Sequence, residues 1–176
     1  MVDPYAVLTV TAAPVYRLAI SPVLADSASR LLVISVRISS AEDSAFRVVP
    51  DYVTLRLPDG QAARVFDRPR AVEIVTRATL ANADFSYLQR SDSDLPGGLS
   101  DDARAQLREA VVDGLLADSI FVSGQTMQAF IVVDTGVPLS TLDGAAIEVV
   151  GYRVRDESGV RGAYQFAAVP PTPEAR

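Results

Sequence analysis

Short runs in which apolar and polar side chains alternate most constrain the fold of this chain. The alternation is clearest in Leu31–Ile38 and Met127–Asp134, where every second residue is apolar. Successive side chains of a β-strand point to opposite faces of a sheet, so a period of two predicts a strand with one buried face. Leu31 and Val33 are apolar as well. We therefore expect the start of this strand to be covered on both faces and the strand to be central in its sheet.

Turn residues divide the rest of the chain into further short runs. Pro58-Asp59-Gly60 predicts a tight turn between two hairpin strands, because Pro presets φ and Gly permits a positive φ. Pro14 is expected to break the first apolar run into two strands. The expected strands are Tyr5–Ala12, Val15–Ile20, Leu31–Ile38, Phe46–Val49, Tyr52–Leu57, Ala62–Phe66, Ile120–Val122, Met127–Asp134, Ala145–Arg155 and Val160–Val169.

The middle of the chain predicts helices instead. Pro69–Asn82 carries a Pro in its first turn, which favours a helix start. A second helix is expected from a cap at Ser100 to about Ala117, because apolar residues recur every four positions and acidic residues occupy its first turn. We expect one mainly β domain over residues 1–169, an antiparallel β-sandwich with a helical insertion at about 67–117, and a disordered Pro-rich tail at 170–176.

Composition excludes much of the usual catalytic chemistry. The 176 residues include no Cys and no His, and all 16 basic residues are Arg. Thiolate nucleophiles, disulfides, histidine general bases and lysine Schiff bases are therefore ruled out. Carboxylates such as Asp113 and Asp118 remain as a conceivable glycosidase pair, although no pattern places them in a cleft. We expect a protein that is not an enzyme.

Charge and hydropathy narrow the setting. The net charge of −6 argues against nucleic-acid binding, which needs a basic face. No apolar run approaches the roughly 20 residues that span a bilayer. The first residues, Met-Val-Asp-Pro-Tyr, lack the basic and apolar regions of a signal peptide. The chain is therefore expected to be cytoplasmic or a processed form.

Three stretches together resemble a known family. They are Leu31–Ile38 with its polar turn, Tyr52–Leu57 with Pro-Asp-Gly, and Val122–Asp134 with its Gly turn and terminal acidic residue. In this respect the chain is similar to the immunoglobulin-like accessory domains of exported bacterial proteins. The resemblance implies an immunoglobulin-like β-sandwich and an extracytoplasmic or envelope-associated setting. The helical segment departs from the simplest form of that family.

Two segments are candidate partner-binding surfaces. Long insertions often carry function, which favours the aromatic and apolar residues of the central loop. An arginine group just before it could grip a carboxylate or phosphate of a partner, or could pair with Asp59, Asp67 or Glu73 on the same surface. The residues concerned are Phe85, Tyr87, Leu88 and Arg90 in the loop, and Arg64, Arg68 and Arg70 before it.

An Asp-rich loop is a candidate metal site. Asp92, Asp94 and Asp101, with Gly97 for the turn, supply the oxygen ligands that Ca²⁺ prefers. The loop lacks the late bidentate Glu of an EF-hand, and a plain solvated loop explains the same residues. A rise in melting temperature with Ca²⁺ would identify this site, since a ligand of the native state must stabilise it.

The sequence therefore favours a non-catalytic interaction or accessory subunit of a larger bacterial assembly. The alternative is a module that binds a small ligand, a carbohydrate or calcium through the Asp-rich loop. Edge strands of an open sandwich can also recruit a neighbour's strand, so self-association is a further expectation.

Overall fold

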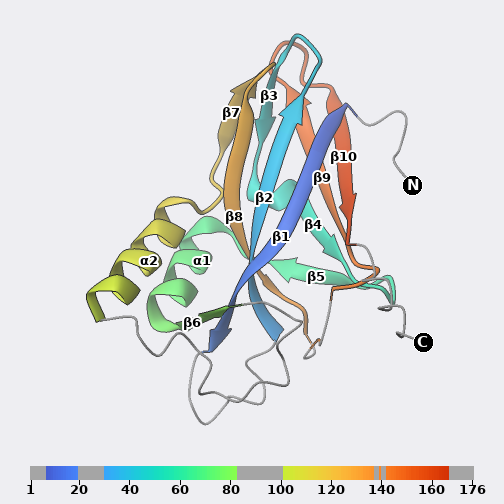
Figure 1. Ribbon diagram of the computed structural model, residues 1–176. Helices are drawn as coiled ribbons and strands as arrows, with labels where there is room; N and C mark the ends of the chain where they lie inside the picture. The colour runs from blue at the N-terminus through green and yellow to red at the C-terminus, as the bar shows by residue number, and fades with distance from the viewer. Residues whose placement is uncertain (1–6, 20–29, 83–100, 137–138, 140–141, 167–176) are drawn as a thin grey trace, which may run out of the picture.

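The computed structural model describes residues 7–19, 30–82, 101–136, 139 and 142–166 (Figure 1). Its helices are the 3-10 helix η2 (Pro50–Tyr52), α1 (Arg68–Arg77) and α2 (Asp101–Asp113). Its strands are β1 (Leu8–Ala19), β2 (Leu31–Ser40), β3 (Ala45–Val48), β4 (Val53–Arg56), β5 (Ala62–Val65), β6 (Thr79–Asn82), β7 (Ser119–Val122), β8 (Thr126–Asp134), β9 (Ala146–Arg153) and β10 (Gly159–Gln165). The described chain is mainly β with antiparallel ladders, which confirms the predicted fold class.

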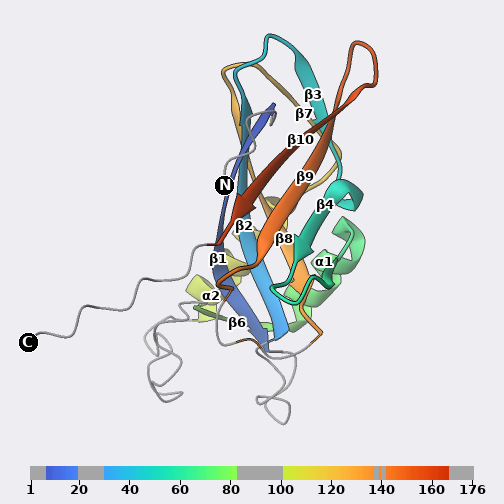
Figure 2. The same ribbon diagram turned by 90° about the vertical axis from the view of Figure 1, so that its right-hand side faces the viewer.

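Strand β5 turns one continuous sheet into two layers. The strand order is β6-β1-β2-β8-β5-β4-β9-β3-β7, with β10 beside β9. Ala62 and Ala63 of β5 pair with β4, whereas Arg64 and Val65 pair with β8. Layer A is formed by β6, β1, β2 and β8, and layer B by β4, β9, β10, β3 and β7 (Figure 2). The immunoglobulin-like form of this arrangement stays a prediction.

The main core lies between the two layers. Every second residue of the long strands points into it, as the alternation predicts, and the same residues are almost fully shielded from solvent. Strand β2 is central, with β1 on one edge and β8 on the other. The inward residues include Leu32, Ile34, Val36 and Ile38 of β2, Val53 and Leu55 of β4, Ile131 and Val133 of β8, and Ile147 and Val149 of β9.

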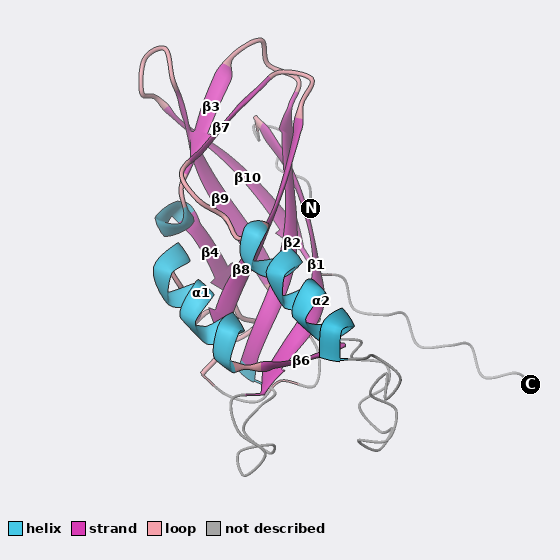
Figure 3. Cartoon of the chain, turned by 90° about the vertical axis from the view of Figure 1, so that its left-hand side faces the viewer, coloured by secondary structure: helices cyan, strands magenta, loops and turns pink. Residues whose placement is uncertain are grey.

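A second apolar cluster covers the outer face of layer A. Leu31 and Val33 of β2 and Val132 of β8 point away from the main core. Helices α1 and α2 lie across them (Figure 3) and contribute Ile74, Val75 and Val111, among other side chains. The start of β2 is therefore buried on both faces, as predicted.

Helix α1 begins and ends for local reasons. Asp67 caps it, since its side chain accepts a hydrogen bond from the Arg70 backbone N–H at 2.9 Å. Pro69 occupies the first turn, where the N–H that Pro lacks has no intrahelical partner. The prediction that this helix extends to Asn82 is wrong. It ends at Arg77, because Thr79–Asn82 form β6 and pair with the end of β1.

Helix α2 also ends earlier than predicted, at Asp113 rather than near Ala117. Its last turn gives way to pairing with β8. The Phe130 backbone N–H donates to the Gly114 carbonyl at 2.7 Å, and the Leu116 N–H donates to the Phe130 carbonyl at 2.8 Å. Backbone groups that would continue the helix are thus taken by a strand distant in sequence.

Pro14 does not break the first strand, so that prediction is wrong as well. β1 runs through it and pairs with β2 on both sides, with a register shift between Pro14 and Tyr16. A bulge accommodates a residue without a backbone N–H. The pairing of β1 with β6 begins only at Tyr16, so the other edge of β1 needs no donor at Pro14.

Layer B closes against layer A where β10 packs on β1. Gly162 of β10 makes this approach possible, because a Cβ atom there would lie 2.4 Å from the Leu8 carbonyl oxygen and 2.8 Å from the Val10 Cγ2. Both distances are shorter than a van der Waals contact. Within the described residues, no helix is long and apolar enough to cross a membrane.

Replacing Gly162 by Ala is expected to force β1 and β10 apart and lower the free energy of unfolding by about 1–3 kcal/mol, the usual cost of overpacking. Urea denaturation followed by circular dichroism measures this. Gly159→Ala in the same strand is the matched control, since its Cβ would meet nothing closer than Tyr152 Cε1 at 3.7 Å. Equal stability of the two variants would contradict this account of the closure.

Candidate functional site

A concave surface of about 970 Å³ lies on the outer face of layer B, at the end where β3 and β7 extend the sheet. Strands β3 and β9, the helix η2, the start of β7 and the turn after β9 all contribute side chains. The lining residues are Arg47, Val49, Asp51, Tyr52, Asp118, Ile120, Tyr152, Arg153, Val154 and Glu157.

Strand register arranges these side chains in two rows. Arg47 of β3 lies between Tyr152 of β9 and Ile120 of β7 in the two ladders. The next row holds Ala45 between Val154 and Val122, because the Val154 N–H donates to the Ala45 carbonyl at 2.9 Å. The intervening residues Phe46 and Phe121 point into the core and pack together at 5.6 Å between ring centroids. Because successive residues of a strand point to opposite faces, the burial of Phe46 and Phe121 places their neighbours Arg47 and Ile120 on the outward face.

Apolar side chains gather at this site although they face solvent. In the described part of the chain the exposed large hydrophobic residues are Ile120, Val154, Val122 and Tyr52, with exposed fractions of 63%, 49%, 44% and 42%. Three of them line the concave surface, and Val122 is two residues from Ile120 on the same face of β7. A grouping of this kind differs from the scattered single hydrophobics of an ordinary surface.

Two tyrosines form one wall. The rings of Tyr52, from η2, and Tyr152, from β9, meet edge to face with their centroids 5.0 Å apart. This geometry is favourable because the positive edge of one ring faces the negative face of the other. The pair gives the site a fixed aromatic surface beside the aliphatic residues.

Arg47 and Asp118 form a two-pronged ion pair within the site. Arg47 Nε donates to Asp118 Oδ1 at 2.7 Å, and Arg47 Nη2 donates to Oδ2. The hydrogen bond from Arg47 lowers the pKa of Asp118 from its ordinary value of 3.8, and the same contact raises the pKa of Arg47. Asp118 is therefore ionised at neutral pH and is poorly suited to donate a proton.

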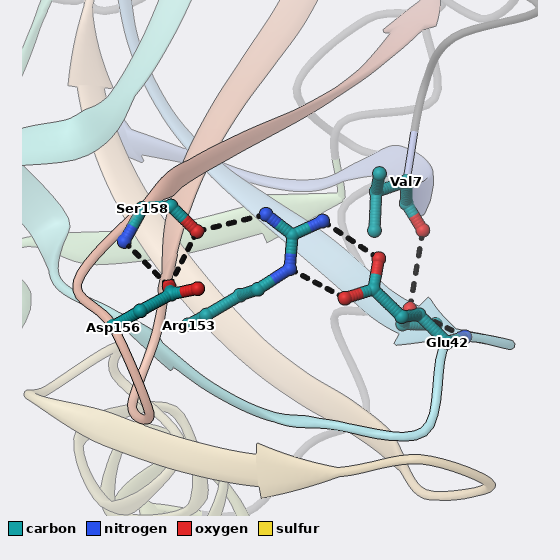
Figure 4. A network of polar contacts seen from close by, with 6 residues as sticks. Val7, Glu42, Arg153, Asp156 and Ser158 are labelled. Carbon is teal, nitrogen blue, oxygen red and sulfur yellow. Dashed lines mark hydrogen bonds and ion pairs between the residues drawn. The ribbon is translucent and has the colours of Figure 1, made fainter.

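A second ion pair joins two strand connections at the rim (Figure 4). Arg153 Nη2 donates to Glu42 Oε2 at 2.7 Å, Arg153 Nε donates to Oε1, and Arg153 Nη1 donates to Ser158 Oγ at 2.9 Å. Ser158 in turn bonds to Asp156 Oδ1 through its backbone N–H and hydroxyl. Arg153 thus connects the β2–β3 turn to the β9–β10 turn. Its hydrogen bonds lower the pKa of Glu42.

The remaining charges of the site are acidic. Asp51 and Glu157 line it, and neither takes part in an ion pair among the residues that the structure describes. The two lining arginines, Arg47 and Arg153, are each neutralised by a carboxylate. The site therefore combines an apolar centre with two carboxylates that are available to an incoming cation.

The predicted partner-binding residues of the central loop, Phe85, Tyr87, Leu88 and Arg90, lie outside the described residues, and their role stays a prediction. The predicted calcium ligands Asp92 and Asp94 lie there too. Asp101 is exposed at the first position of α2. Among the residues with a described placement, no group of three or more acidic side chains could hold a metal ion.

The three predicted arginines contact three different partners within the chain. Arg64 lies over the Phe66 ring at 4.8 Å, Arg68 donates to the Val112 carbonyl at 3.5 Å, and Arg70 pairs with Glu73. The pairing with Glu73 is one of the alternatives that the sequence left open. None of the three lines the concave surface. Their binding of a partner stays a prediction.

Local sequence patterns do not identify the residues that form this site. The sequence suggests only Asp113 as a partner for Asp118, and Asp113 does not line the concave surface. Arg47 and Asp118 are 71 positions apart, so no local pattern connects them. One usable signal was present: Ile120, Phe121 and Val122 are all apolar. A strand without alternation has either two buried faces or one exposed apolar face.

Comparisons with known proteins add little to this geometry. The chain matches no protein-family model and no curated protein sequence. Among solved structures it is similar to the YjhA protein from Bacillus subtilis, with a TM-score of 0.41 and 11% sequence identity over 92% of this chain and 93% of that one. At this TM-score the likeness carries neither a fold nor a function from one protein to the other.

Acid is expected to weaken the Glu42–Arg153 link. The folded pKa of Glu42 lies below its ordinary value of 4.5, so its stabilising effect is complete above about pH 5 and disappears as the pH falls through the folded pKa. Glu42→Gln is therefore expected to have a lower urea midpoint than the unmodified protein at neutral pH, with a gap that narrows as the pH falls below the ordinary pKa of 4.5.

The control for this prediction is Glu109→Gln on the exposed surface of α2, a residue in none of the ion pairs of the described chain. It removes the same charge without touching the link between the two turns. A gap between Glu42→Gln and the unmodified protein that stayed constant with pH would contradict the account.

Proposed function

We propose that this chain is a non-catalytic interaction domain, an accessory subunit that binds a protein partner through the concave surface of layer B. The observation that carries the proposal is the gathering of Tyr52, Ile120, Val122 and Val154, which are exposed and close together at one end of one face. Contiguous exposed apolar side chains are typical of protein–protein interfaces, because covering them removes apolar area from water.

The arrangement around these residues also supports a protein partner. Ion pairs stand beside the apolar centre, Arg47 with Asp118 and Arg153 with Glu42. Protein interfaces combine an apolar centre with a polar rim, and tyrosine and arginine are enriched in them. The edge-to-face tyrosine pair and the two-pronged ion pair hold side chains in place before binding, which reduces the ordering cost of association.

Support for the absence of catalysis comes from the chemistry of the site. Its side chains offer no thiol and no imidazole, because the chain contains neither Cys nor His. Asp118 is held ionised by Arg47, which leaves it without a proton to donate. A binding role makes use of the exposed apolar side chains, the tyrosine pair and the ion pairs of the site. A hydrolytic role would instead need a carboxylic acid with a raised pKa.

The wider setting of the proposal comes from the sequence resemblance. Immunoglobulin-like accessory domains of exported bacterial proteins would provide two facing β-layers and an exposed sheet face for a partner. We therefore include in the proposal an immunoglobulin-like form and an extracytoplasmic or envelope-associated bacterial assembly. The alternative is a module that binds a carbohydrate, another small ligand or calcium through the Asp-rich loop. Such a ligand has no need of the exposed Ile120, Val122 and Val154.

The direct test is the native size and composition of the complex that the protein forms in gentle extracts of its own cells. Size-exclusion chromatography with mass spectrometry is expected to find it in an assembly larger than its 18.8 kDa. Charging the apolar centre with Ile120→Glu and Val154→Glu is expected to weaken partner capture by at least about tenfold, as for central interface residues. Elution as a lone chain would contradict the proposal.

Two control variants make that test specific. Ala105→Glu adds a charge at an exposed position of α2, away from the concave surface, and is expected to leave capture unchanged. Joint replacement of Phe85, Tyr87 and Leu88 by Ala tests the central loop instead. If this loop variant loses the partner and the Ile120→Glu, Val154→Glu variant keeps it, the partner surface is the loop and not the concave face.

A further inference from the structure

On the basis of the proposed function, we propose that an extended segment of the partner pairs with the free edge of β7 as a new strand. In this segment every second residue is apolar, and the segment carries Lys or Arg. Strand β7 stands at the end of the sheet order, with β3 as its neighbour in the described chain. An extended peptide can pair its backbone with such an edge, while its side chains enter pockets on the adjoining face.

The backbone of Ile120 has the orientation that strand addition requires. The Val122 N–H donates to the Gln125 side chain at 3.3 Å, and the Val122 carbonyl accepts from the Gln125 N–H at 3.0 Å. Val122 therefore directs its backbone groups away from β3. In an antiparallel ladder this direction repeats every second residue, so the N–H and carbonyl of Ile120 also point to the free edge.

The other side of β3 agrees with this pattern. The Ala45 carbonyl accepts from Val154 of β9, so the pair Ala45–Val122 exchanges no backbone hydrogen bonds within the β3–β7 ladder. The same then holds for the pair Arg47–Ile120, two residues along. A new strand would satisfy the outward groups of Ile120 without breaking an existing ladder bond.

The side chains of β7 favour the addition of another strand at this edge. Natural edge strands are commonly blunted by a charged residue or a proline. On β7 the outward side chains are Ile120 and Val122, both exposed. A strand added here would extend the two rows Tyr152–Arg47–Ile120 and Val154–Ala45–Val122 by one residue each. Cross-strand packing favours apolar residues at these two places.

The charges around the site favour basic residues in the added segment. Asp51 and Glu157 face the site outside the ion pairs of the described chain, so a basic side chain on the partner finds a carboxylate there. A second copy of this chain fits poorly, because each copy carries a net charge of −6. Next to β7, Arg47 forms an ion pair with Asp118. A basic, alternating segment of a different protein is the occupant that fits both backbone and charge.

The experiment starts from a library of short random linear peptides selected on the intact protein. In the enriched peptides every second residue is expected to be apolar, and Lys or Arg is expected to be present. These peptides are expected to bind the double variant Asp51→Asn, Glu157→Gln more weakly than the unmodified protein and with less salt dependence. A library that yields no binder, or only binders that survive Ile120→Glu, would overturn the proposal.

Backbone pairing is tested separately on an enriched peptide. N-methylation of the one peptide nitrogen that pairs with the Ile120 carbonyl is expected to weaken binding about tenfold, whereas N-methylation of the nitrogens on either side of it is tolerated, since these point away from β7. In the protein, the Ile120 amide is expected to become protected from hydrogen exchange on binding. A uniform response to N-methylation with an unprotected Ile120 amide would exclude strand addition.

These outcomes separate the proposal from the function on which it rests. If the native partner depends on Ile120 and Val154 but leaves the Ile120 amide unprotected, strand addition is wrong and the interaction domain stands. If the native partner tolerates Ile120→Glu with Val154→Glu, both fail. If Ile120→Glu prevents β7 from folding, Ile120→Thr is used in its place, because Thr is also β-branched and favours a strand.

Discussion

The burial of β2 and β8 on both faces is the constraint on which the rest of the structure depends. Leu32 and Ile131 face the core between the layers, while Val33 and Val132 point the opposite way and are fully buried as well. Apolar residues on both faces of a strand require cover on both sides. Layer B covers one side, and α1 and α2 cover the other. The helical insertion is thus part of the fold, because it shields apolar area that layer A would otherwise expose.

Within the described residues, this division leaves the outer face of layer B as the sheet face that neither α1 nor α2 covers. Its two ends differ. At the β4 end, Arg56 pairs with Glu148, which makes an ordinary polar surface. At the β3 and β7 end, Ile120 and Val154 are exposed beside the tyrosine pair. Because β9 runs through both ends, pairing with β4 at one and with β3 at the other, the apolar end is a property of particular side chains and not of the architecture. That contrast is the physical reason to regard it as a binding surface.

Much of the fold could be predicted from the sequence, because strand alternation and turn residues are local signals. Features that depend on distant neighbours could not. Pro14 reads as a strand break until β2 accommodates it with a register shift, and the end of α2 is set by Phe130 of β8. The site was missed for the same reason. Nothing near Asp118 in the sequence identifies Arg47 as its partner, and an apolar strand does not tell which of its faces stays exposed.

The central claim is that the concave surface of layer B is where the partner binds. Hydrogen–deuterium exchange, measured by mass spectrometry on the free chain and on the complex isolated from its own cells, tests it most directly. The account predicts that slowed exchange on binding is concentrated in 45–52, 118–122 and 152–157, with α2 unchanged. Slowed exchange confined to α2 or to 64–70, with those three segments unaffected, would contradict it.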